Sequence, residues 1–246
     1  MRDDAPMPSV FAIPSVAFFG RTFDEYMQMF AIDEAALRGK RVLDCPSGPD
    51  GFVAESAARG LDVIGCDPMF SLDPEAAHAR AKRDIENTLA VAIGTADSPR
   101  FRDPDAFART KHEALARFIT DYAAGRGTRY VAASLPTLPF ADRQFDVVLA
   151  SHFLFCYADV REGGMMTGSP FDLDFHLRSI EEIARVCAGE MRFVPTHGMQ
   201  QPPHRHPYLQ PAIERLHALG FNTRLEPSTY DDGFLPLVNV LVATRS

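Results

Sequence analysis

The sequence predicts one α/β domain in which helices flank a mostly parallel sheet of seven strands. Two observations predict this class. From Lys40 onward, short apolar runs alternate with segments of helical periodicity, as strands and helices do in βαβ units. The composition is that of a globular chain, with 46% hydrophobic and 24% charged residues, and 246 residues are enough for one large core. We therefore expect residues 1–246 to fold as a single domain.

The first βαβ unit is predicted between residues 41 and 67. Residues 41–44 form an apolar strand, residues 50–59 a helix that ends at Gly60, and residues 61–67 a second strand. Further strands are predicted at residues 130–134, 145–151, 190–195, 221–226 and 238–244, and further helices at residues 173–187 and 208–219.

A long connection separates the second and third predicted strands, far longer than a single crossover helix needs. It contains two helix starts of the same kind, Asp73-Pro74-Glu75 and Asp103-Pro104-Asp105. Each places a capping acid before a proline, whose missing N–H costs nothing at the first helical position. We expect residues 73–126 to form a helical insertion that serves as a lid or an oligomer surface.

The segment between the first strand and its helix has the form of a nucleotide-binding turn. Gly48 and Gly51 permit positive φ or close approach of a ligand, and free N–H groups at the helix start face the cleft above the strands. Asp44 ends the first strand and Asp67 the second, at a separation where a carboxylate can accept hydrogen bonds from ribose hydroxyls. Pro68 favours extended geometry at Asp67. These residues predict a nucleotide site at the carboxyl edge of the sheet.

The turn resembles the first motif of the class I S-adenosylmethionine-dependent methyltransferases, an acid-x-Gly-x-Gly-x-Gly sequence followed by a ribose-binding acid. Residues 138–148, Leu-Pro-Phe-Ala-Asp-Arg-Gln-Phe-Asp-Val-Val, look like the family's passage from third to fourth strand, and residues 183–186 with 190–194 look like the helix and strand that follow. The three landmarks occur in the family's order. The resemblance implies a Rossmann-like, doubly wound fold, S-adenosylmethionine as cofactor, and methyl transfer to a small organic acceptor by in-line displacement.

The resemblance also implies which residues hold the cofactor, most of them at strand ends or in the turns that follow. They are Asp44, Pro46 and Gly48 for the methionine part, Asp67 and Pro68 for the ribose, Met69, Ser134 and Leu135 for the adenine, Ser151 toward the reactive methyl, and Tyr26 as a cover over the cofactor. Other readings stay open, because strand-end acids also cap turns and Tyr26 also fits a core position.

The turn departs from the family's pattern at three positions. Pro46 and Asp50 stand where glycines are usual, and Ser134 stands where an acid often receives the adenine amino group. Pro46 lacks an N–H donor, and a hydroxyl makes a weaker hydrogen bond than a carboxylate. Two alternatives therefore stay open: an S-adenosylmethionine-binding protein with a non-methyl-transfer or silent role, and an NAD-dependent oxidoreductase. The NAD motif fits less well, because only the half Gly48-x-x-Gly51 of Gly-x-Gly-x-x-Gly is present.

Candidate catalytic residues follow the fourth predicted strand. A sulfonium methyl is already activated, so the main catalytic demand is alignment. Where the acceptor must lose a proton, His152 is the first candidate for a general base because imidazole titrates near neutrality, and Tyr157 and His176 are second candidates. No metal site is predicted, since Asp172, Asp174 and His176 would not share one helix face.

Charge and local composition limit the classes of partner that we expect. The chain has 25 basic and 33 acidic residues, a net charge of −8, which disfavours nucleic acid. The apolar run at residues 10–19 contains Pro14 and follows acidic rather than basic residues, so we expect no secretory signal, no membrane partner and a cytoplasmic location. The expected partner is a small-molecule acceptor, and the insertion leaves a homodimer open.

Overall fold

The computed structural model describes residues 12–95, 103–199, 204–230 and 238–245 of the chain. Strands and helices alternate over much of it from residue 41 onward, as the apolar pattern predicts. The strands are β1 (Arg41–Asp44), β2 (Asp62–Cys66), β3 (Tyr130–Val131), β4 (Phe145–Ser151), β5 (Cys187–Val194), β6 (Phe221–Ser228) and β7 (Val238–Arg245). The α-helices are α1 (Phe23–Met29), α2 (Gly51–Ala58), α3 (Pro74–Thr95), α4 (Pro104–Gly125), α5 (Leu173–Val186) and α6 (Leu209–Ala218).

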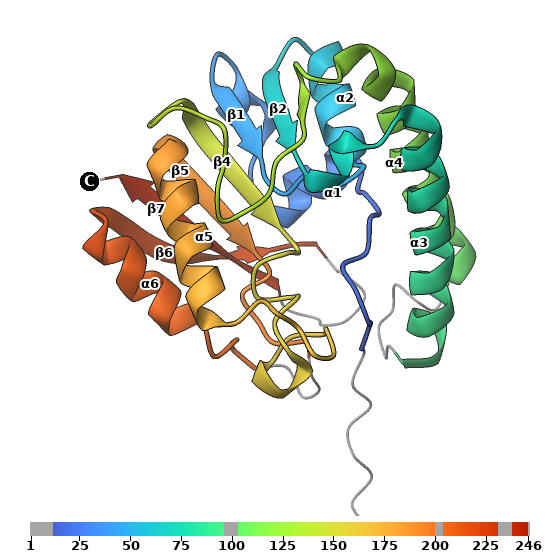
Figure 1. Ribbon diagram of the computed structural model, residues 1–246. Coiled ribbons are helices and arrows are strands. Elements are labelled where there is room, and N and C mark those ends of the chain that lie inside the picture. Colours follow the sequence, from blue (N-terminus) through green and yellow to red (C-terminus); the bar gives the residue numbers. More distant parts are fainter. Residues whose placement is uncertain (1–11, 96–102, 200–203, 231–237, 246) are drawn as a thin grey trace, which may run out of the picture.

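The strands form one seven-stranded sheet in the order β3-β2-β1-β4-β5-β7-β6 (Figure 1). Neighbours from β3 to β5 pair in parallel, and β7 pairs antiparallel with both β5 and β6. The sheet is therefore mostly parallel, as predicted, with β7 as the exception. The strand order reverses between β1 and β4, and doubly wound sheets bind ligands at such a point, beyond the carboxyl ends of the strands.

Alternate side chains of the central strands enter two separate cores. Val42 of β1 packs in a core with α1, α2 and the helices of the insertion, whereas the neighbouring Leu43 packs in a core with α5 and α6. Val147 and Val148 of β4 divide in the same way. Because both faces of the sheet are covered, the central strands are apolar at nearly every position.

The connection between β2 and β3 contains the two predicted helices, α3 and α4. Asp73 accepts a hydrogen bond from the Ala76 N–H at 2.8 Å, and Asp103 caps α4 through the Ala106 N–H. Helix α4 packs against α2 and α3, and α3 stands at the right edge of the view in Figure 1. The chain between the two helices, residues 96–102, lies outside the described residues. A role for this insertion as a lid or an oligomer surface stays a prediction.

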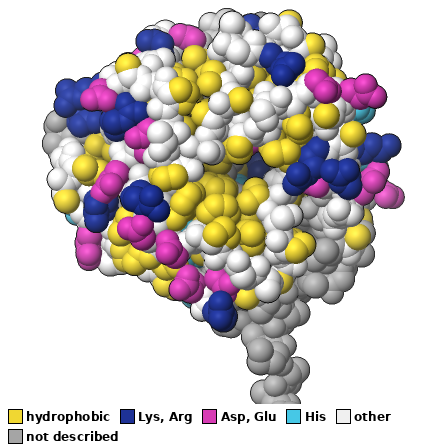
Figure 2. All heavy atoms as spheres, viewed as in Figure 1, with side chains coloured by type: hydrophobic (Ala, Val, Ile, Leu, Met, Phe, Trp, Pro, Cys, Tyr) yellow, Lys and Arg dark blue, Asp and Glu magenta, His cyan; other side chains and the backbone are white. Residues whose placement is uncertain are grey.

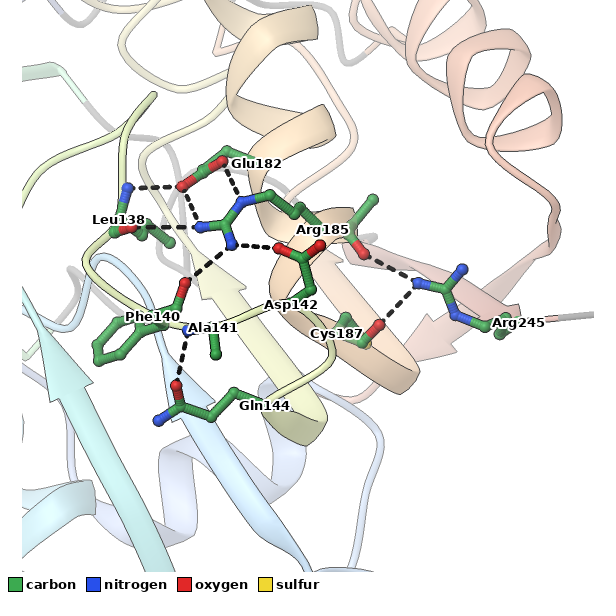
Figure 3. A network of polar contacts seen from close by, with 10 residues as sticks. Leu138, Phe140, Ala141, Asp142, Gln144, Glu182, Arg185, Cys187 and Arg245 are labelled. Atoms are coloured by element: carbon green, nitrogen blue, oxygen red, sulfur yellow. Dashed lines mark hydrogen bonds and ion pairs between the residues drawn. The ribbon is translucent and has the colours of Figure 1, made fainter.

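The segment between β3 and β4 is a loop fastened to α5 by Arg185 (Figure 3). The Arg185 guanidinium donates two hydrogen bonds to Glu182 and one each to the Asp142 carboxylate and the Leu138 and Phe140 carbonyls, at 2.7 to 3.2 Å. All five guanidinium N–H groups are thus used within the protein. The motif at residues 138–148 is held in place by this contact.

Strand β3 is shorter than predicted. It ends at Val131, and Ser134 lies beyond it in a turn in which the Thr137 N–H donates to the Ser134 carbonyl at 3.1 Å. The early end follows from pairing, because β2, the neighbour of β3, itself ends at Cys66 opposite Val131. Among the described helices, none combines the length and the apolar character that crossing a membrane requires.

Candidate functional site

A cavity of about 580 Å³ lies at the carboxyl edge of the sheet, where the strand order reverses. Its size is typical of small-molecule sites. Its walls come from the turn after β1, the ends of β2 and β4, helix α3 and the segment before α1. Figure 2 shows hydrophobic side chains gathered at the centre of the face seen in Figure 1. The predicted cofactor residues that line the cavity are Pro46, Gly48, Asp67, Pro68, Met69, Ser134, Leu135 and Ser151.

The glycine turn and Asp67 are joined directly. Gly48 has a φ of 66°, which glycine adopts without strain, and its N–H donates to Asp67 Oδ2 at 3.1 Å. The Met69 N–H donates to Asp67 Oδ1 at 2.8 Å. Burial raises the pKa of Asp67 to about 6, although both hydrogen bonds oppose the shift. An ionised carboxylate has about four acceptor positions, so roughly two are left for a ligand.

Asp44 and Asp50 form a buried acid pair next to Tyr26. Asp50, the residue directly before α2, lines the cavity, whereas Asp44 is fully buried and is not among the residues that line the cavity. The Tyr26 hydroxyl lies 3.0 Å from both oxygens of Asp44 and also hydrogen-bonds Asp50. Burial raises the pKa of both carboxyls, that of Asp50 to about 7. The Tyr26 hydroxyl has one proton to donate, so the two buried carboxylates also repel each other, which adds to the rise in the pKa of Asp44.

Tyr26 supports this pair instead of covering the cavity. Its side chain is fully buried and stacks on Phe52, with ring centroids 4.2 Å apart. Tyr26 and Asp44 thus lie behind the residues that a ligand would touch. Both lie close to the predicted site, where Tyr26 contacts the cavity residue Asp50.

Arg21 brings a positive charge to the same end of the cavity. It is 8% exposed and lines the cavity, and its backbone N–H donates to the Asp50 carboxylate. Within the described residues its guanidinium makes one hydrogen bond, from Nε to the Tyr230 hydroxyl at 3.2 Å. The preceding Gly20 is required here, because a Cβ would lie 2.2 Å from the Pro49 carbonyl oxygen. The remaining Arg21 donors are available to a ligand.

A buried ion pair connects the insertion to this end of the cavity. Lys111 Nζ of α4 lies 2.9 Å from Glu25 Oε1 of α1, with side chains 1% and 9% exposed. The Tyr230 hydroxyl donates to the same Glu25 oxygen at 3.1 Å and accepts from Arg21. Three segments far apart in sequence therefore meet beside Arg21.

Residues 13–21, which we term the N-terminal strap, line one wall of the cavity and connect its opposite sides (Figure 1). At one end the Ile13 N–H donates to the Met165 carbonyl at 2.8 Å, in the loop after β4. Further along, the Phe18 N–H donates to Asp84 of α3 at 2.8 Å. The strap thus bridges the β4 loop and the insertion.

Ser151 ends β4, His152 follows it directly, and both line the cavity. His152 has a φ of 45°, in the left-handed region that is uncommon outside glycine, and its N–H donates to the Val194 carbonyl at 2.7 Å. Such backbone is concentrated at functional sites. Its ring meets Tyr230 edge-on, with centroids 6.2 Å apart. The predicted first candidate for a base is therefore at the cavity.

The two second candidates differ in position. Tyr157 lines the cavity, but its hydroxyl accepts a hydrogen bond from the Ala17 N–H at 3.0 Å, and burial raises its pKa. His176 is buried outside the described lining: its Nε2 accepts from the Phe155 N–H at 2.9 Å, and its Nδ1 lies 2.7 Å from the Asp172 carbonyl. Both ring nitrogens are paired with backbone groups, so the structure does not bring His176 to the site.

Sequence reasoning missed Arg21 and treated Asp50 only as a departure from glycine. The available signal for Arg21 was a cation directly after a glycine at the end of the apolar run Val16–Phe19. The aromatic residues Phe153, Phe171 and Phe175, which also line the cavity, had no distinguishing signal among the other phenylalanines. Within the ranges that the structure describes, no three His, Cys, Asp or Glu side chains are placed to hold a metal ion.

Comparison with curated proteins finds one relative. The chain is 27% identical to an uncharacterized protein of Methanocaldococcus jannaschii over 187 residues, which cover 74% of this chain and 79% of that protein. No family model matches the chain.

Comparison with solved structures finds several matches that cover most of this chain at low sequence identity. One is magnesium protoporphyrin IX methyltransferase from Synechocystis PCC 6803 with bound SAM, at 15% identity and a TM-score of 0.48, covering 91% of this chain and 78% of that one. Another is 1,6-didemethyltoxoflavin-N1-methyltransferase from Burkholderia thailandensis with bound S-adenosylhomocysteine, at 15% identity and a TM-score of 0.46, covering 91% and 77%. A SAM-dependent methyltransferase from Methanosarcina mazei has 16% identity and a TM-score of 0.44, covering 84% and 92%.

Proposed function

We propose that the protein is an S-adenosylmethionine-dependent methyltransferase that moves a methyl group to a small organic acceptor by in-line displacement. The observation that carries the proposal is the set of charged side chains around the glycine turn. Asp67 ends β2 with acceptor positions for a ribose diol, and Arg21 and Asp50 offer opposite charges in the same cavity. This set matches a nucleoside joined to an amino acid, whose carboxylate and ammonium would pair with Arg21 and Asp50.

Asp50 also discriminates between cofactor classes. In dinucleotide sites the pyrophosphate binds at the N-terminus of the helix after the first strand, where free N–H groups favour negative charge. Here an acid that lines the cavity, Asp50, directly precedes that helix, α2. A carboxylate at this place repels a pyrophosphate and attracts an ammonium group, which favours S-adenosylmethionine over NAD.

The remaining cavity residues supply alignment and a route for a proton. S-adenosylmethionine supplies an activated methyl group, so this chain's own task is to orient the acceptor and exclude water. We assign His152 as the general base for an acceptor that must lose a proton, and Tyr157 as a positioning residue that anchors the strap. The strap and α3 line the cavity between them, which supports the insertion's role as a lid.

Calorimetric titration tests the proposal directly. We expect S-adenosylmethionine and S-adenosylhomocysteine to bind and NAD not to bind. Asp67→Asn should weaken both ligands about 10- to 100-fold, since hydrogen bonds to a charged group contribute about 1.5–3 kcal/mol. Asp62→Asn is the matched control, because Asp62 lies at the opposite end of the same strand with its side chain 66% exposed. Binding of NAD alone, or equal loss in both variants, would contradict the proposal.

Product formation separates methyl transfer from silent binding. A pooled small-molecule extract incubated with the protein and methyl-labelled S-adenosylmethionine should yield a labelled product, and His152→Asn should reduce its formation about 10²- to 10⁴-fold. Asparagine tolerates the left-handed backbone of this position, so the variant removes the imidazole with little strain. Ligand binding without any labelled product would favour the silent alternative.

A further inference from the structure

The cavity has two chemically different ends. The loops after β2 and β3 lie on one side of β1, and the loop after β4 lies on the other, because of the strand order. The first end carries the glycine turn and Asp67. We call the second the aromatic end, defined by Phe153, Tyr157, Met165, Phe171, Phe175 and Met199.

The rings of the aromatic end pack against one another and still leave surface for a ligand. The centroids of Phe153 and Phe171 are 5.1 Å apart and those of Phe171 and Phe175 are 4.8 Å apart, with the ring planes inclined. All three side chains are half-buried although they line a cavity inside the fold. Aromatic faces and methionine sulfurs favour contact with another ring system.

The residues that define the aromatic end have no charged side chain. Arg80 of α3 also lines the cavity, but its charge acts on Asp67 at the first end. Its Nε lies 2.7 Å from Asp84, and its terminal nitrogen donates to the Val16 carbonyl at 3.2 Å. The Tyr157 hydroxyl is engaged by the strap. An ionised acceptor group would therefore be buried among rings and sulfurs without a dedicated partner, which is costly.

We propose that the methyl acceptor is an uncharged aromatic molecule, bound at the aromatic end with the atom to be methylated facing His152. This inference rests on the proposed function and names the substrate class of the same site. His152 marks the boundary between the two ends, since it follows β4 directly and begins the loop that carries Phe153 and Tyr157.

Three compounds with the same fused two-ring framework test the substrate class. They are 2-naphthol, which is aromatic and uncharged, 2-naphthoate, which is aromatic and anionic, and 2-decalol, which is uncharged and saturated. Their affinities are measured by calorimetry with the full chain saturated with S-adenosylhomocysteine. We expect 2-naphthol to bind at least tenfold more tightly than the anionic 2-naphthoate and the saturated 2-decalol. Equal or tighter binding of 2-naphthoate or of 2-decalol, or no binding of 2-naphthol, would overturn the proposal.

A ring substitution locates the site. Phe175→Leu keeps apolar volume and removes the ring, and should weaken 2-naphthol about two- to tenfold, the worth of one aromatic contact, with S-adenosylhomocysteine affinity unchanged. Phe221→Leu is the control, because that ring is buried outside the cavity lining; it should change neither affinity. Unchanged naphthol affinity in Phe175→Leu would refute the location.

The two proposals fail in different ways. If S-adenosylhomocysteine itself does not bind, the proposed function falls and this inference falls with it. If S-adenosylhomocysteine binds and 2-naphthol does not, the cofactor assignment stands and the aromatic acceptor is rejected.

Discussion

Two arginines of this protein differ in how many of their hydrogen-bond donors the protein itself uses. Arg185 donates five hydrogen bonds to Glu182, Asp142 and two carbonyls, which saturates its guanidinium (Figure 3). Arg21 makes one side-chain hydrogen bond within the described residues, although it is more deeply buried. Donors buried without partners are costly and therefore rare. The difference indicates that Arg185 is structural, and it supports the proposal that Arg21 pairs with a ligand in the cavity.

The surroundings of the two arginines differ as well. The Arg185 side chain is 34% exposed and its partner Asp142 is 77% exposed, so water and salt screen part of their interaction. Arg21 lies beside Asp50 and is linked through Tyr230 to the buried Glu25 and Lys111. Substitutions in the buried network around Arg21 should therefore have larger effects than substitutions around Arg185.

The largest expected effect is on stability, from Lys111→Ala. This change removes the Lys111 ammonium from the buried Glu25 carboxylate, and breaking a buried ion pair on one side costs about 3–5 kcal/mol in the free energy of unfolding. Urea unfolding measures it. The double variant Lys111→Met with Glu25→Met should recover part of the loss, because apolar residues can replace a buried ion pair, although Tyr230 and the Thr22 N–H then lose their acceptor. A loss below about 1 kcal/mol in the single variant would show that the pair is not buried as described.

A crossed pair of substitutions tests the comparison of the two arginines. Arg21→Met should weaken S-adenosylhomocysteine binding about 10- to 100-fold, since charge-assisted hydrogen bonds contribute about 1.5–3 kcal/mol. Arg185→Met should leave this affinity unchanged and lower the free energy of unfolding by about 1–3 kcal/mol, because the Leu138 and Phe140 carbonyls lose their donor. Calorimetry and urea unfolding on both variants measure the four values. A ligand defect in Arg185→Met would remove the distinction.

The smallest expected effect is a pH dependence of cofactor affinity. The Asp50 carboxyl, with a pKa of about 7, must ionise to pair with an ammonium group. Affinity for S-adenosylmethionine should therefore fall about tenfold from pH 8 to pH 6, and Asp50→Asn should flatten this dependence. For the ligand-free protein the sign is opposite: this pKa lies above the ordinary value, so the contribution of Asp50 to stability decreases as pH rises from about 4 to 7. Calorimetry across pH measures the affinities, and an affinity that rises toward pH 6 would contradict the assignment.

The first core elements could be predicted because their signals are local. The apolar run 41–44, the glycine turn and the apolar run ending at Asp67 gave β1, the start of α2 and β2 to within one residue or so. The Asp-Pro pairs likewise predicted the starts of α3 and α4, since a cap and a first-turn proline act within one helical turn. The end of β3 was missed because strand length depends on pairing with a neighbour.

Among the cofactor-site predictions, too, those that depend on local sequence succeed better than those that depend on packing. Gly48, Asp67 and Met69 line the cavity as expected, because a strand end and its following turn determine where they lie. Asp44 and Asp50 could not be ranked from the sequence, since Asp44 ends β1 and Asp50 lies in the turn just after it. Only packing under Tyr26 decides which one reaches the cavity.

By itself, then, the sequence determined the alternation of strands and helices, the glycine turn and the acid at the end of β2, all of which depend on contacts between near neighbours in the chain. Tertiary structure decided that Lys111 pairs with Glu25, that Tyr230 joins Arg21 to that pair, and that the strap lines a cavity with an aromatic end. These contacts join residues up to 209 positions apart. Periodicity carries no information over such separations, because these contacts depend on how the two cores pack on the sheet.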